Sequence, residues 1–226
     1  MPGLLRALAC VLPFALIAGC GPVSPAIVSE PLQPAAGGPV SYLVGSIGPA
    51  AEDDAYTHQR IKLRKTDTQE NAAAVWGNGL VGNTPSDIKG APVGEHYSKP
   101  GVASVFVLPL KPGHYEIYDT EFYWPGDDNL SINAKRKFSV PMDLEPGKAY
   151  YLGEFRSRCL QRMLCFFSLR DQRARDEVIA RRYSPNLPTL EVLSLDMKPA
   201  FPFITSANNP EPASLAEERA QAPNGN

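Results

Sequence analysis

Apolar and polar residues alternate in short runs through the middle of the chain. Segment 130–140 shows the clearest alternation, because apolar side chains recur at every second position and only Arg136 breaks the order. Segment 58–65 alternates in the same way. A period of two residues places the apolar side chains on one face of a β-strand. The pattern therefore predicts strands with one buried and one solvated face.

Turn residues separate these runs. Pro112-Gly113 and Pro146-Gly147 each follow an apolar segment, and proline followed by glycine fits the backbone angles of a tight turn. The almost wholly apolar segment 102–108 is typical of a central strand covered on both faces. Short strands at this spacing indicate a mainly β protein, an antiparallel β-sandwich of about seven strands. The strands are predicted at 40–47, 58–65, 102–108, 114–124, 130–140, 149–156 and 166–169.

One C-terminal helix is predicted, over 171–183. Asp171 can cap its first turn, and Ser184-Pro185 ends it, because proline disfavours helical backbone in the residue before it. The side chains expected to share one face of this helix are Ala174, Val178 and Arg181.

The first twenty residues have the layout of an export signal. Arg6 precedes an apolar stretch at 7–17, and small residues then lead into Cys20. The run Leu16-Ile17-Ala18-Gly19-Cys20 resembles the lipobox of bacterial lipoproteins. This resemblance implies that a signal peptide at 1–19 is removed and that the Cys20 sulfur carries a diacylglyceryl group. The alternative is an ordinary secretory signal in which Cys20 has no special role.

The lipobox resemblance also implies a location. Several acyl chains on Cys20 would anchor a protein to a membrane essentially irreversibly, since each buried methylene contributes about 0.8 kcal/mol to the free energy of membrane binding. In Gram-negative lipoproteins an aspartate after the cysteine usually retains the protein at the inner membrane, and this chain has Gly21 there. The resemblance therefore implies a lipid anchor in the outer membrane of a Gram-negative bacterium, facing the periplasm.

Proline and glycine distinguish the start of the chain from its centre. Segment 20–39 contains several of both and no aromatic residue, which predicts a lipidated tether. The β-sandwich domain is expected at 40–198, and 199–226 is expected to be a disordered tail.

Charge excludes one class of partner. The 22 lysines and arginines nearly balance the 24 acidic residues, and no basic stripe is present, so nucleic acid is not an expected partner. Arginines are frequent in the C-terminal third, among them Arg156, Arg175 and Arg181. They either lie on solvated faces, paired with acids such as Asp176 and Glu177, or contact anionic lipid heads or cell-wall acids.

Two cysteines remain in the expected domain, Cys159 and Cys165. An even number in an oxidising compartment favours a structural disulfide across a hairpin loop. A redox or metal pair is the alternative, but five intervening residues do not match the C-x-x-C spacing. We therefore predict a disulfide between them.

Catalytic signatures do not stand out. The chain has neither a G-x-S-x-G nor a P-loop sequence, and its histidines, His58, His96 and His114, show no metal-ligand spacing. We expect these histidines to be exposed. Asp127-Asp128 indicates a solvated turn, because one loop has too few oxygens for calcium. We therefore expect no enzyme activity, no metal and no cofactor.

Aromatic residues crowd segment 114–124. By alternation about half of them face the core. Tyr118, Tyr123 and Trp124 are candidates for a stacking platform that binds a sugar or a protein partner. Cross-strand pairing within the sheet explains most of these aromatics without any ligand.

Several local features together resemble a known family. They are the Pro112-Gly113 turn before Tyr115, the strand through Phe138, the Pro146-Gly147-Lys148 turn into Tyr150-Tyr151-Leu152-Gly153-Glu154, and the helix end at Arg182-Tyr183. Over 40–190 the chain is similar to small bacterial outer-membrane lipoproteins of unknown function with a transthyretin-like or carboxypeptidase-regulatory-like sandwich. The resemblance implies this fold and brings no catalytic residues with it.

The expected function follows from the implied anchor and the missing motifs. We expect a non-catalytic, lipid-anchored protein that binds or scaffolds another component of the cell envelope. The alternative is a lipoprotein that binds carbohydrate or peptidoglycan through its aromatic side chains. A hydrolytic enzyme is the least expected of the three.

Overall fold

The computed structural model describes residues 23–51, 56–79, 82–90, 99–126, 129–160 and 164–206. The signal peptide, Cys20, His96, Asp127-Asp128 and the tail beyond 206 lie outside the described residues. What the sequence predicts for them stays a prediction.

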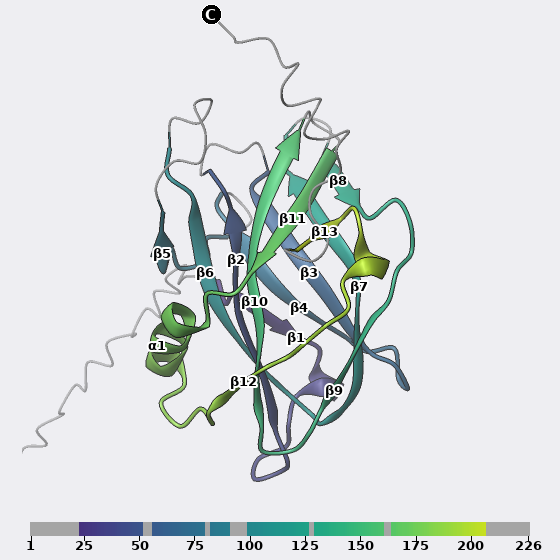
Figure 1. Ribbon diagram of the computed structural model, residues 1–226, viewed down its shortest axis with the longest axis vertical. Coiled ribbons are helices and arrows are strands. Elements are labelled where there is room, and N and C mark those ends of the chain that lie inside the picture. Colours follow the sequence, from purple (N-terminus) through teal and green to yellow (C-terminus); the bar gives the residue numbers. More distant parts are fainter. Residues whose placement is uncertain are drawn as a thin grey trace, which may run out of the picture.

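Two β-sheets pack face to face, with sheet B in front of sheet A in the view of Figure 1. Sheet A has the order β1 (Ala26–Val28), β4 (Asn71–Gly77), β3 (His58–Lys65), β7 (Gly113–Trp124), β8 (Leu130–Asn133), and β9 (Val140–Leu144) also pairs with β7. Sheet B has the order β13 (Ile204–Thr205), β11 (Leu164–Arg170), β10 (Ala149–Leu160), β2 (Ser41–Pro49), β6 (Val102–Leu110), β5 (Ile88–Lys89), and β12 (Leu190–Val192) also pairs with β10. The described helices are η1 (Glu30–Leu32), α1 (Arg173–Tyr183) and η2 (Lys198–Ala200), of which η1 and η2 are 3-10 turns.

The arrangement confirms a mainly β, sandwich-like fold, with a single α-helix among the described residues. The prediction of about seven antiparallel strands is wrong, because the described residues form thirteen strands and sheet B is mixed. In sheet B, β2 and β12 run parallel to β10, and β13 runs parallel to β11. Several of the additional strands have only two or three residues, and a strand of that length has no detectable period.

The main core lies between the inner faces of the two sheets. Phe122 of β7 stacks on Phe167 of β11, with 4.8 Å between ring centroids. Phe155 of β10 meets the same Phe167 ring edge to face at 6.2 Å. These aromatic contacts join sheet A to sheet B near one end of the sandwich. Other fully buried core side chains are Leu43, Ile47, Ile61, Leu63, Phe106, Leu108 and Ile117.

α1 covers part of the outer face of sheet B, against β2 and β6. The helix begins at Arg173 and not at Asp171, whose Oδ1 accepts the Arg173 backbone N–H at 2.9 Å. Its buried residues are Asp176 and Ala180, whereas Val178 is 57% exposed. Ala174 and Val178 thus both lie on the exposed side of the helix, which turns a carboxylate toward the sheet.

The sandwich extends beyond 40–198 at both ends. β1 lies in the expected tether and pairs with β4, while Leu32 of η1 is fully buried and its carbonyl accepts the Lys111 N–H. In the expected tail, Ala200 and Ile204 are fully buried, and β13 pairs with β11. A few apolar residues are enough to hold these short segments on the sandwich, because each residue adds to a core that the longer strands form.

The predicted strand 130–140 is two strands, β8 and β9, which both pair with β7. The Ala134 N–H leaves the ladder and donates to Asp119 Oδ1 at 3.0 Å, and the chain bends at 135–136. Ile132, Phe138 and Val140 are nevertheless all buried. Alternation thus identified the buried side chains correctly and missed the interruption.

Candidate functional site

A cavity of about 360 Å³ opens between the two sheets beside β8 and β11. β8, β11 and β13 lie together at the upper right of Figure 1. Most of the cavity wall is apolar, and polar side chains come from β7, from the end of β8 and from the bend after it. The lining residues are Thr120, Phe122, Ile132, Asn133, Lys135, Arg136, Leu164, Cys165, Phe166, Pro202 and Phe203.

Packing behind the wall holds the cavity open. The ring of Phe122 rests on Phe167, and the ring of Phe203 stacks on Phe138 with 6.0 Å between centroids. Phe122, Phe138 and Phe167 are buried, so their positions are set by the core. The cavity is therefore a preformed feature of the sandwich.

The predicted disulfide is present between Cys159 and Cys165. The two residues are direct partners in the β10–β11 ladder, with 4.1 Å between their Cα atoms. Cys165 also lines the cavity. The bond therefore ties β11 to its neighbour at the place where β11 forms the cavity wall.

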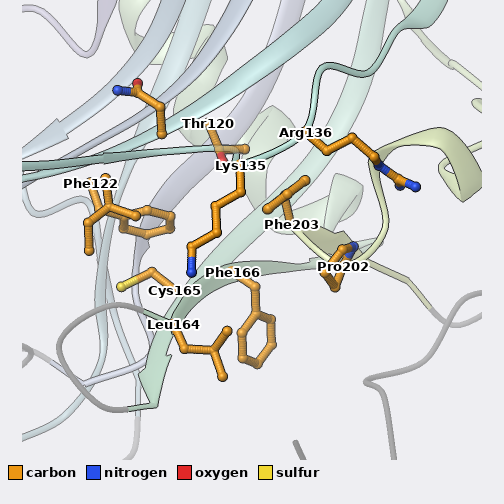
Figure 2. A pocket seen from close by; sticks show the side chains of 11 residues that line it. Thr120, Phe122, Lys135, Arg136, Leu164, Cys165, Phe166, Pro202 and Phe203 are labelled. Atoms are coloured by element: carbon orange, nitrogen blue, oxygen red, sulfur yellow. The ribbon is translucent and has the colours of Figure 1, made fainter.

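Two cations lie at the rim, on the bend between β8 and β9. Arg136 Nη2 donates to the carbonyl oxygens of Phe201 at 2.6 Å and Pro199 at 3.4 Å, which ties this bend to η2. Lys135 is exposed and makes no hydrogen bond or ion pair with any described residue. In Figure 2 its side chain extends across the cavity toward β11, whereas Arg136 points away from the cavity.

A second polar group lies beneath α1, centred on Asp176, which is fully buried. Asp176 Oδ2 accepts from the Ser46 hydroxyl at 2.7 Å and the Tyr151 hydroxyl at 2.8 Å. Its Oδ1 accepts from Arg175 Nε at 2.8 Å and Nη2 at 2.6 Å. Burial raises the pKa of Asp176, and these donors oppose the shift. Both oxygens have donors, so the group fastens the helix to the sheet.

Glu154 and Arg156 extend this polar group along β10. Glu154 Oε1 accepts from Arg156 Nε at 2.9 Å and from Arg175 Nη2 at 3.0 Å. Arg156 Nη1 donates to the carbonyl oxygens of Pro49, at 3.0 Å, and Val102. Burial lowers the pKa of Arg156. Arg156 is only 8% exposed, so the prediction of a solvated face is wrong for this arginine.

A bulge at Gly153 brings these side chains to one face. The β2–β10 register shifts between Tyr151 and Gly153, where the glycine has φ +125°. Tyr150, Leu152 and Phe155 consequently face the inner core, while Tyr151 and Glu154 face the side covered by α1. Strict alternation would have separated Tyr151 from Glu154.

The three aromatic candidates do not form one platform. Tyr118 donates to Asn71 Oδ1 at 3.0 Å, and Arg64 lies 4.7 Å over its ring. Tyr123 donates to Asn129 Oδ1 at 3.0 Å. Trp124, the next residue, packs against the inner core. Tyr123 and Trp124 therefore lie on opposite faces of β7, and glycan binding through these residues stays a prediction without added support.

The histidines lie apart. His58 is 5% exposed, so the expectation of a surface position is wrong for it, whereas His114 is exposed and lies 2.5 Å from Asp143. Burial lowers the pKa of His58. Within the described ranges, no three side chains of His, Cys, Asp or Glu group closely enough to hold a metal ion. None of the helices in the described part of the chain is long and apolar enough to cross a membrane.

Sequence reasoning missed Lys135 and Asp176 as site residues. Lys135 stands on the polar face of the alternating run, and no feature of the sequence distinguishes it from Lys137 on the same face. Asp176 precedes Ala180 by four residues, a spacing that places both on one helix face. That spacing was the available signal, and it indicates a buried polar contact only once a partner surface is known.

Comparison with known proteins gives no match: no protein-family model, no curated protein and no solved structure is similar to this chain.

Proposed function

We propose that the protein is a non-catalytic, lipid-anchored module of the cell envelope that binds an apolar ligand in the cavity between β7, β8 and β11. The observation that carries the proposal is the cavity itself. It is about 360 Å³ in volume and mostly apolar, and buried aromatic rings back its wall. Small-molecule sites are usually preformed clefts of this kind, with a few polar groups that orient the ligand.

Physical chemistry makes this wall suitable for a hydrocarbon ligand. Each methylene that moves from water to an apolar wall contributes about 0.8 kcal/mol. Because the wall belongs to the folded core and the disulfide ties β11 to β10, the protein loses little conformational entropy on binding.

The location belongs to the same proposal. The Leu16–Cys20 pattern supports acylation of Cys20, and Gly21 supports the outer membrane of a Gram-negative bacterium, with the domain in the periplasm. An apolar ligand is consistent with this location, because the membranes of the cell envelope are a source of apolar molecules.

Calorimetric titration with 1-decanol tests the binding proposal. The full chain with Cys20→Ser avoids acylation and hence detergent, which would compete for the cavity. We expect decanol to bind this protein, and Leu164→Trp to weaken binding about tenfold or more by filling the space. Val192→Trp, at a residue that is 52% exposed on β12 and does not line the cavity, is the control. Absence of binding, or equal binding by the Leu164→Trp protein, would overturn the proposal.

A further inference from the structure

We infer that the cavity selects a single-chain amphiphile with an anionic head, a fatty carboxylate, whose head group pairs with Lys135. This inference rests on the proposed function, because it specifies the ligand of the same cavity. It is argued from the charges at the rim, the reach of Lys135 and the size of the cavity.

Charge at the rim has one sign. The lining includes Lys135 and Arg136, and no aspartate or glutamate from the described residues belongs to it. Arg136 already donates to two backbone carbonyls, so its position is fixed by η2 and the residues after it. Lys135 has no partner among the described residues, and its ammonium can bind an anion without losing an existing contact.

The reach of Lys135 connects charge to the apolar wall. Its side chain crosses the cavity toward Leu164, Cys165 and Phe166 (Figure 2). An alkyl chain lying against Phe122, Ile132 and Phe166 would place a terminal carboxylate within reach of the ammonium. Because Lys135 is exposed, the pair forms in contact with water and neither charge pays the cost of full burial.

The other head groups fit less well. An uncharged head leaves the ammonium with water alone, and a quaternary ammonium head meets two positive side chains, Lys135 and Arg136. The volume of about 360 Å³ is near the lower end for ligand sites, which favours one chain over the two of a phospholipid.

Matched ten-carbon probes test the inference by calorimetry on the full chain with Cys20→Ser. Decanoate, 1-decanol and decyltrimethylammonium differ only in the head group. We expect decanoate to bind about three- to fivefold more tightly than decanol, in the upper part of the range of an exposed ion pair, and the cation to bind most weakly. Lys135→Met should abolish the preference for decanoate over decanol. Lys137→Met is the control, since Lys137 lies on the same bend and does not line the cavity.

The outcomes separate this inference from the proposed function. Equal binding of decanoate and decanol, or a preference that survives Lys135→Met, would overturn the anionic head and leave the apolar cavity in place. Failure of all three probes to bind would overturn both. Sedimentation with vesicles of dilauroylphosphatidylglycerol distinguishes a single-chain anion from a phospholipid head group. Vesicle binding that requires Lys135, in a protein that does not bind decanoate, would overturn the fatty carboxylate.

Discussion

Gln59 is a polar side chain held inside the sandwich without a hydrogen-bond partner among the described residues. It is fully buried on β3, opposite Trp76 and Phe122 of the neighbouring strands, and neither Nε2 nor Oε1 is bonded. An unsatisfied buried amide costs about 1–3 kcal/mol. We expect Gln59→Leu to raise the free energy of unfolding by about 1 kcal/mol, measured by urea titration. Gln33→Leu, at an exposed position, should change it by no more than about 0.5 kcal/mol. A loss of stability in the Gln59→Leu protein would contradict this account.

His58 gives the fold a dependence on pH. Burial holds its pKa below the ordinary value of 6.5, so the unfolded chain binds a proton more readily than the folded one. The contribution of His58 is therefore constant above about pH 6.5 and is lost as the pH falls below that value. An NMR titration of the imidazole should have its midpoint below 6.5. A midpoint at or above 6.5 would show that the ring is solvated or paired with an acid.

At the scale of elements, the contact between α1 and sheet B depends on one carboxylate. Asp176→Ala removes the acceptor of Ser46, Tyr151 and Arg175, and leaves the Ser46 and Tyr151 hydroxyls buried without it. We expect a loss of about 2–5 kcal/mol in the free energy of unfolding, because each buried hydroxyl left without an acceptor costs about 1–3 kcal/mol.

Glu177→Ala on the same helix is the matched control. Among the described residues Glu177 pairs only with Arg181, one turn later, at 2.7 Å. Both side chains are partly exposed, so the loss should be about 0.5 kcal/mol. Equal effects of the two substitutions would mean that Asp176 does not fasten the helix.

The elements also show what sequence pattern can and cannot predict. Sequence pattern located β2, β3, β6, β7 and β10, by alternation in β3 and by apolar or aromatic runs between turn residues in the others. It failed where local contacts between side chains and backbone determine the strand. The Asp119 carboxylate accepts the Ala134 N–H and so ends β8, and the bulge at Gly153 exchanges the inner and outer faces of β10. It also could not find β1 and β13, whose two or three residues pair with strands that are distant in the sequence.

At the scale of the whole molecule, the sequence predicted the disulfide and not the cavity. Cys159 and Cys165 are six positions apart, and their pairing needs only a hairpin. The cavity needs β7, β8, β11 and the segment after η2 to meet, which no local pattern encodes. Lys135 becomes a candidate only after these elements are placed.

The proposed lipid anchor is the other property of the whole molecule, and it belongs to residues outside those described. We expect radiolabelled palmitate to be incorporated into the protein and the labelled protein to fractionate with outer membranes. Cys20→Ser should abolish both. Membrane association of the Cys20→Ser protein, or absence of label in the wild type, would exclude the lipoprotein interpretation.

The most direct test of the central claim, that the cavity holds an apolar ligand, is NMR chemical-shift mapping with decanoate. The backbone amides of Thr120, Ile132, Cys165 and Phe166 should shift together with increasing ligand, while those of α1 stay unchanged. Shifts confined to another surface, or no shifts at saturating decanoate and decanol, would contradict the account.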